Sequence, residues 1–151
     1  MFDLRDLYMQ VIVDHNKAPR NFGKLQHYNH DADGHNPLCG DKLHLYLHVD
    51  AHDVIKDISF EGEGCAISVA SASLMSEAMK GKTVAEFEAM FDAFQKMVTA
   101  DLAQEPDDEQ LGKLAVLAGV REFPSRIKCA VLCWHTMKLA IEDASEAAKT
   151  E

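Results

Sequence analysis

The sequence lacks the features that would place the protein in a membrane or on nucleic acid. No run approaches the ~20 apolar residues of a membrane-spanning helix, and the first six residues lack the apolar stretch of a signal peptide. Acidic residues outnumber basic ones by 25 to 15, for a formal net charge of −10. Because phosphates attract basic surfaces, this balance argues against nucleic acid. We therefore expect a cytoplasmic protein with no membrane and no nucleic-acid partner.

Cysteine is also scarce, and its spacing is not that of a zinc ribbon. The chain has 4 cysteines, and no two of them form a Cys-x-x-Cys knuckle. Cysteines stay reduced in the cytoplasm, so metal or sulfur chemistry is favoured over disulfides. Internal repeats and low-complexity blocks are absent as well. At 151 residues, the chain is expected to form one domain over residues 1–151 and to bury a core without the help of disulfides.

Three of the cysteines are predicted at element boundaries, where distant parts of a chain converge. One glycine separates Cys39 from Asp41, and it can bend the backbone so that thiolate and carboxylate face the same point. Cys65 opens a helical segment, and Cys129 follows a Pro-Ser helix start. Three thiolates and a carboxylate suit tetrahedral zinc or an iron–sulfur cluster, although the hard oxygen of Asp41 suits the cluster less well. Buried, inert thiols are the alternative, and spacing alone does not decide between them.

The predicted surroundings of Cys65 and Cys129 favour thiolates over thiols. Both lie at helix N-termini, where the partial positive charge and free backbone N–H groups stabilise an anion. Arg126 and Lys128 add positive charge near Cys129, although solvated surface charge is the alternative interpretation of both. Cys133 lies one helical turn after Cys129, and we expect it to be a small buried side chain rather than a fourth thiolate.

The hydrophobic pattern predicts one helix followed by a small antiparallel sheet. Apolar residues recur at helical spacing over residues 3–15. Residues 43–49 then alternate leucine or valine with polar side chains, which is typical of a half-buried strand. A turn leads into a second strand over residues 54–61, and the loop before the first strand can add another. His44 falls on the polar face, where we expect a solvated side chain.

Helices are predicted for the rest of the chain. Residues 66–79 are rich in alanine and serine, and a Thr-x-x-Glu capping box at Thr83 opens the next helix. A short helix over residues 107–118 follows an acidic linker, and the last helix starts near Ser125. The fold class is therefore α+β: a small antiparallel sheet with helices mainly on one side, including an N-terminal helix and a long C-terminal helix.

Four segments of the chain match sequence motifs of a known family. The three cysteine motifs are Asn36-Pro37-Leu38-Cys39-Gly40-Asp41, Gly62-Glu63-Gly64-Cys65-Ala66-Ile67-Ser68 and Arg126-Ile127-Lys128-Cys129-Ala130. They resemble those of the U-type iron–sulfur cluster assembly proteins, which comprise IscU, SufU and the NifU N-terminal domain. The segment 14–23 is similar as well. The resemblance covers nearly the whole chain and implies a SufU/IscU-like fold that serves iron–sulfur cluster assembly.

Details of the resemblance favour the SufU branch. The scaffold branch places a histidine directly before its third cysteine, and that position is Lys128 here. SufU-type proteins also carry an insertion between the second and third cysteines, and the stretch 66–128 is long enough to contain it. In this branch zinc is bound by three cysteines and an aspartate, which match Cys39, Cys65, Cys129 and Asp41.

The resemblance also implies partners. SufU-like proteins accept sulfur from a pyridoxal-phosphate cysteine desulfurase of the SufS type and pass it on to a downstream Suf cluster scaffold. In that mechanism Cys39 leaves the zinc and accepts the sulfur, a desulfurase histidine replaces it as ligand, and Arg126 helps to dock the partner.

Two other functions remain open for the same residues. One is a non-enzymatic scaffold or carrier that holds iron or a [2Fe–2S] cluster on Cys39, Cys65 and Cys129. The other is a protein whose zinc is purely structural. Cys133 departs from the family motif.

Overall fold

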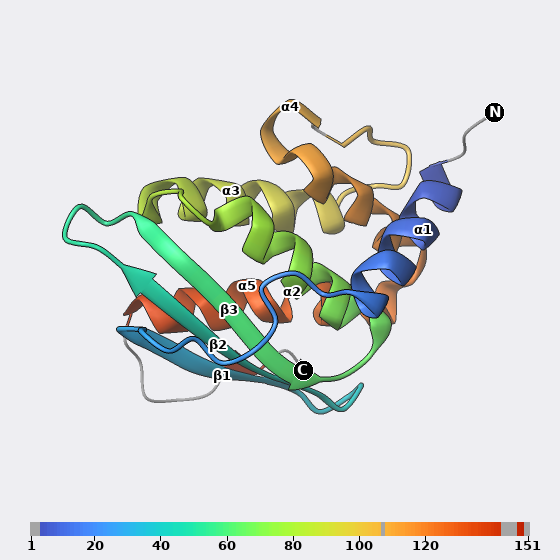
Figure 1. Ribbon diagram of the computed structural model, residues 1–151. Coiled ribbons are helices and arrows are strands. Elements are labelled where there is room, and N and C mark those ends of the chain that lie inside the picture. Colours follow the sequence, from blue (N-terminus) through green and yellow to red (C-terminus); the bar gives the residue numbers. More distant parts are fainter. Residues whose placement is uncertain (1–3, 107, 143–147, 150–151) are drawn as a thin grey trace.

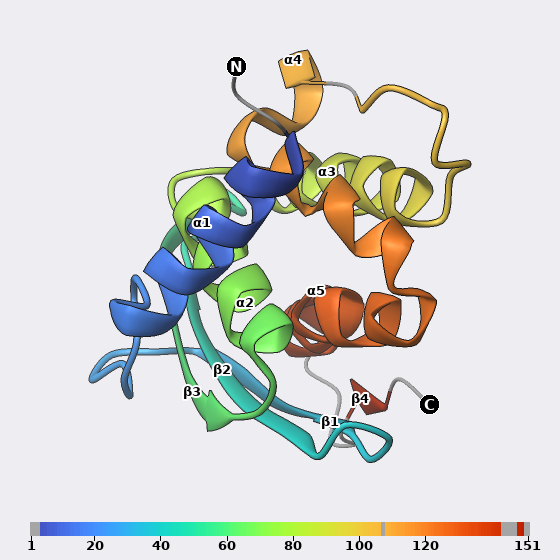
Figure 2. The same ribbon diagram turned by 90° about the vertical axis from the view of Figure 1, so that its right-hand side faces the viewer.

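The fold is built on a four-stranded sheet with the strand order β3-β2-β1-β4; Figure 1 labels the first three strands, and Figure 2 also labels β4. The computed structural model describes residues 4–106, 108–142 and 148–149. The strands are β1 (His30–Asn36), β2 (Asp41–Val49), β3 (Ile55–Glu63) and β4 (Ala148–Lys149). The first three are antiparallel neighbours, because short turns join them, while β4 pairs with β1 in parallel.

The helices cover one face of this sheet, as Figure 2 shows. They are α1 (Leu4–Lys17), α2 (Ala66–Met79), α3 (Val84–Val98), α4 (Asp108–Leu111), the 3-10 helices η1 (Gly112–Glu122) and η2 (Pro124–Arg126), and α5 (Ile127–Glu142). Helix α5 packs on β1 and β2, α2 packs on β3 and α5, and α1 packs on α2. The α+β fold class with helices on one side is therefore confirmed. Among the described residues, every helix is too short or too polar to cross a bilayer.

The core lies between the sheet and α5. Leu47 of β2 is fully buried beside its cross-strand partner Ile58, as the period-two pattern predicts. Trp134 of α5 is also fully buried and stacks on Phe87 and Phe94 of α3, with a ring-centroid distance of 4.8 Å to Phe94. These ring contacts thus join α3 to α5, and α5 in turn packs on β1 and β2.

His44 on the opposite face of the sheet is less solvated than expected. Its Nε2 lies 2.8 Å from Asp31 Oδ2, and its Nδ1 contacts Asp33. Burial lowers the pKa of His44, but the hydrogen bonds to the two aspartates raise it, and the net shift is upward. The strand pairing opposes β1 and β2 in a register that places both carboxylates beside this histidine.

Two predicted element boundaries are confirmed. Helix α2 spans the predicted residues 66–79. The capping box at the start of α3 is present in both directions: Glu86 N–H donates to Thr83 Oγ1 at 3.1 Å, and Thr83 N–H donates to Glu86 Oε1 at 3.0 Å. These boundaries depend on local contacts, which explains why the sequence predicts them well.

The predicted helix over residues 107–118 is wrong in both type and length. Residue 107 lies outside the described residues, and α4 ends where Gly112 adopts a φ of +56°, a left-handed conformation that interrupts an α-helix. The chain continues as the 3-10 helix η1 through Gly119. A Cβ on Gly119 would lie 2.6 Å from the Tyr8 ring, so this glycine serves close packing against α1 rather than helix termination.

Candidate metal centre

Cys39 lies in the turn of the β1–β2 hairpin. Asn36 and Asp41 are cross-strand partners at the end of the ladder, and residues 37–40 form the turn between them. Gly40 has a φ of +73°, which provides the bend between the thiol and the carboxylate. Cys39 is half-buried in this turn, whereas Asp41 is completely buried.

Cys65 caps the N-terminus of α2 and lies beside Asp41, as its predicted place at a helix start requires. Its backbone N–H donates to Asp41 Oδ1 at 2.7 Å, and its Sγ lies 4.0 Å from Asp41 Oδ2. The same Sγ accepts from the backbone N–H of Ser68 at 3.4 Å. A Cβ on Gly64 would lie only 2.5 Å from Asp41 Oδ1, so the two segments approach this closely because residue 64 is glycine.

Cys129 comes from the first turn of α5 and is fully buried. Its Sγ lies 3.1 Å from Cys39 Sγ. The ligand atoms of Cys39, Asp41 and Cys129 all lie within 4.8 Å of one another. Cys65 is not part of this trio, because its sulfur is turned to cap α2 and approaches the group from the Asp41 side. The structure thus brings all four predicted ligands into one neighbourhood, three of them in a single group.

One arginine faces this collection of acidic groups. Arg126 Nη1 donates to Cys39 Sγ at 3.4 Å, and a hydrogen bond with Cys129 is the largest cause of a raised pKa of Arg126. Arg126 therefore contacts the site and is more than a solvated surface charge. Burial raises the pKa of the Cys129 thiol, and its neighbours Cys39, Asp41 and Cys65 raise it further. A single guanidinium does not balance several thiolates, so their joint ionisation requires another cation.

Cys133 is separate from this group. It is fully buried one turn further along α5, with its Sγ 3.5 Å from Ser71 Oγ. Burial raises the pKa of the Cys133 thiol to about 12. This is the expected position of a small packing side chain.

The chain matches a known protein family over most of its length. Residues 7–130 match the family described as the NifU-like N terminal domain. The chain belongs to this family. The family resemblance seen in the cysteine motifs is therefore confirmed.

Named relatives of this NifU-like domain cover nearly its whole length. The iron–sulfur cluster assembly scaffold protein IscU of Streptococcus pyogenes serotype M1 is 42% identical over 144 residues, which cover 95% of this chain and 88% of the relative. The zinc-dependent sulfurtransferase SufU of Bacillus subtilis (strain 168) is 44% identical over 140 residues, or 92% of each chain. The crystal structure of a putative scaffold for the SUF system from Fervidobacterium islandicum AW-1 has a TM-score of 0.79 at 36% identity, with 87% and 94% of the two chains covered.

The side chains of this NifU-like domain fit a zinc ion. Three thiols and one carboxylate are ligand types that form tetrahedral zinc sites. Asp41 is fully buried, and its hydrogen bonds within the described part of the chain come from the Cys65 N–H, from Cys65 Sγ at 4.0 Å and from Asn36 Nδ2. None of these donors is a cation. Because a buried carboxylate without a positive partner is costly, a cation between Asp41 and the sulfurs would complete the site.

The segment 14–23 is similar to the family in sequence but has no predicted role. In the structure it contacts α2, the helix that Cys65 caps. Asn16 Nδ2 donates to the carbonyl of Ala66 at 2.8 Å, which ties the end of α1 to the residue after Cys65. Asn21 Nδ2 donates to Ser76 Oγ at 3.0 Å. The segment therefore fastens α1 and the following loop to α2. The motif was visible in the sequence, but its contacts depend on the tertiary structure.

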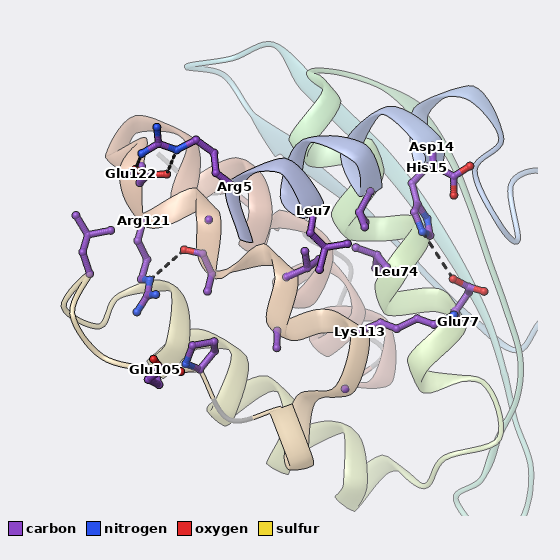
Figure 3. Close-up of a pocket in the computed structure, with 18 of the residues that line it drawn as sticks. Arg5, Leu7, Asp14, His15, Leu74, Glu77, Glu105, Lys113, Arg121 and Glu122 are labelled. Carbon is purple, nitrogen blue, oxygen red and sulfur yellow. Dashed lines mark hydrogen bonds and ion pairs between the residues drawn. The ribbon is translucent and has the colours of Figure 1, made fainter. Parts of the chain in front are cut away.

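A separate cavity of about 920 Å³ lies between α1, α2 and η1 (Figure 3). Its wall mixes apolar side chains such as Leu74 with an ion pair between Arg5 and Glu122, and His15 Nε2 lies 4.0 Å from Glu77 Oε1. Burial lowers the pKa of His15. Among the described residues that line the cavity, none is a cysteine, so the cavity is distinct from the thiol cluster.

Proposed function

We propose that this protein is a zinc-dependent sulfur acceptor of the SufU type. It would take persulfide sulfur from a cysteine desulfurase and pass it to a downstream Suf cluster scaffold. The observation that carries the proposal is the unequal placement of the two sulfurs that lie in contact. Cys39 is half-buried in a turn beside Arg126, whereas Cys129 is fully buried at the start of a helix. Only the first is accessible to a partner's sulfur.

Four side chains would hold the zinc: Cys39, Asp41, Cys65 and Cys129. When bound, the metal would keep these thiols deprotonated and shielded until a partner arrives. The zinc-dependent name of the Bacillus subtilis relative supports this choice of metal. The placement of Lys128 before the third cysteine, where the scaffold branch has a histidine, also supports it.

The proposed transfer is a thiolate–persulfide exchange. The Cys39 thiolate attacks the terminal sulfur of a persulfide on the desulfurase cysteine. A new S–S bond forms on Cys39 as the old one breaks, and the desulfurase cysteine leaves as a thiolate. No net oxidation occurs, because one S–S bond replaces another. The persulfide proton stays on the transferred sulfur, and the negative charge leaves with the desulfurase thiolate. Arg126, with Nη1 3.4 Å from Cys39 Sγ, is placed to balance the charge of the attacking Cys39 thiolate and to help dock the partner.

A cluster scaffold or carrier is the second candidate. The relatives named IscU favour it, since their names describe cluster assembly scaffolds. The same three cysteines would supply sulfur ligands to a [2Fe–2S] cluster.

Metal analysis with a visible spectrum of freshly purified protein separates the two candidates. The sulfur acceptor should be colourless with about one zinc per chain, whereas a cluster carrier should be brown and contain iron. Mass spectrometry after one turnover with desulfurase and cysteine should then locate a persulfide on Cys39. Arg126→Ala should retain its zinc and lose most of the desulfurase stimulation. A persulfide on Cys129 with Cys39 unmodified would contradict the mechanism.

A further inference from the structure

Asn36 touches two of the proposed metal ligands but is not one of them. It is the last residue of β1 and is completely buried. Its Nδ2 lies 3.2 Å from Asp41 Oδ2 and 3.4 Å from Cys129 Sγ. Asp41 follows it across the hairpin, but Cys129 comes from α5, 93 residues along the chain. One amide group therefore connects the hairpin ligand to the helix ligand.

The orientation of the Asn36 amide follows from the chemistry of its neighbours. A carboxylate oxygen only accepts hydrogen bonds, so the NH₂ end of the amide must face Asp41. The two N–H groups of that end can then serve Asp41 and Cys129 separately. The amide oxygen, Asn36 Oδ1, is buried with no hydrogen-bond partner in the described part of the chain. An unpaired buried acceptor is costly, so this orientation serves the two ligands at the expense of the amide's own oxygen.

The carboxylate of Asp41 is held by two N–H donors, one at each oxygen. The Cys65 N–H holds Oδ1 at 2.7 Å, and Asn36 holds Oδ2. Oδ2 is also the oxygen that lies 4.0 Å from Cys65 Sγ. Removal of the Asn36 amide would leave Asp41 Oδ2 and Cys129 Sγ without this N–H donor. Cys39 has no bond to Asn36 among the described contacts, so the amide holds two of the four proposed ligands and does not hold Cys39.

We propose that Asn36 is the positioning residue of this metal centre. It would orient Asp41 and Cys129 for the metal through N–H···O and N–H···S hydrogen bonds while Cys39 stays free to leave. The inference rests on the proposed function, because it takes Asp41 and Cys129 as ligands. Loss of such an outer-shell partner typically lowers metal affinity by about 10–100-fold.

Cobalt binding provides the test, because the absorption spectrum of Co²⁺ changes when a ligand is lost. Asn36→Leu replaces the amide with a side chain of similar shape that has no donor. We expect Co²⁺ affinity, measured against a competing chelator, to fall about 10–100-fold, and the spectrum to shift toward that of Asp41→Ala. The double variant should lose less affinity than the sum of the two single losses, because the part of the Asn36 effect that acts through Asp41 is already absent in Asp41→Ala. Asn29→Leu is the control. The Asn29 amide donates to the Val49 carbonyl, away from the cysteines, so the Co²⁺ affinity of this variant should be unchanged.

Two results would overturn the inference. One is an Asn36→Leu protein with wild-type affinity and spectrum. The other is a double variant whose loss equals the sum of the two single losses, as expected if Asn36 only stabilises the fold. If Asn36→Leu does not fold, Asn36→Ala repeats the test with a smaller side chain. These outcomes leave the proposed function intact, whereas failure of the wild-type protein to bind Co²⁺ or Zn²⁺ would overturn both.

Discussion

The contact between Gly64 and Asp41 yields a prediction that can be worked out in detail. An alanine at residue 64 would place its Cβ 2.5 Å from Asp41 Oδ1 and 3.0 Å from Asp41 Cα and Cβ. Asp41 is fully buried and paired with Asn36 across the hairpin, so it has little freedom to withdraw. The backbone of residues 64–65 must therefore move away. That movement breaks the hydrogen bond from the Cys65 N–H to Asp41.

The size of the effect follows from that bond. A hydrogen bond to a charged group contributes about 1.5–3 kcal/mol, and 1.4 kcal/mol corresponds to about a tenfold change in an equilibrium constant. We therefore expect Gly64→Ala to bind zinc about 10–100-fold more weakly. The effect of the alanine is the steric clash with Asp41 and not backbone strain, because Gly64 does not adopt a left-handed backbone conformation.

Competition with a chromophoric chelator measures the zinc affinity, and Gly34→Ala is the matched control. A Cβ at residue 34 would lie 2.0 Å from Thr136 Oγ1, in the contact between β1 and α5. This overpacking should cost about 1–3 kcal/mol of stability and lower the melting temperature by roughly 3 °C per kcal/mol, with little effect on zinc. Equal zinc affinities for Gly64→Ala and the wild type would refute the reasoning, as would an equal loss in Gly34→Ala.

Three further predictions concern the thiols, the metal and the outer face of the sheet. Cys39→Ala should abolish desulfurase stimulation and weaken zinc binding, whereas Cys133→Ala should retain zinc and activity; a stimulation assay with metal analysis checks both. Removal of zinc should raise amide hydrogen exchange first in residues 62–66 and 125–131, because the ligands hold these segments together, and identical exchange with and without zinc would contradict this. The pKa of His44 is raised in the folded state, so its stabilising contribution is present below its ordinary value of 6.5 and is lost as the pH rises through the folded pKa. His44→Gln should therefore lower the melting temperature at pH 5.5, by an amount corresponding to about 1 kcal/mol or less for a pair of this exposure. The difference in melting temperature from the wild type should shrink with rising pH. A difference that stays constant with pH would show that the aspartate contacts do not stabilise the protonated histidine.

Most of the secondary structure could be predicted because it depends on local periodicity. The capping box at Thr83 and the alternation over residues 43–49 involve residues close together in the chain. The capping box appears as expected, and the leucines of residues 43–47 are buried as the alternation predicts, but Tyr46 between them is buried as well. The segment after Asp101 was predicted less well. The predicted helix runs without a break over residues 107–118, but Gly112 separates α4 from a 3-10 helix, and Gly119 packs against Tyr8. The strand β4 has only two residues, too few for a periodic signal.

The sequence by itself determined the family and the chemistry available to the site. Short motifs placed three thiols and one carboxylate next to glycines and helix starts, and these are properties of neighbouring residues. Only the tertiary structure decided how the groups meet. The contact between Cys39 and Cys129, the bond from the Cys65 N–H to Asp41, and the contact of the Asn36 amide with Cys129 join segments 24 to 93 residues apart. Distances of a few ångströms across such separations depend on how the sheet and α5 pack, and no local pattern in the sequence records them.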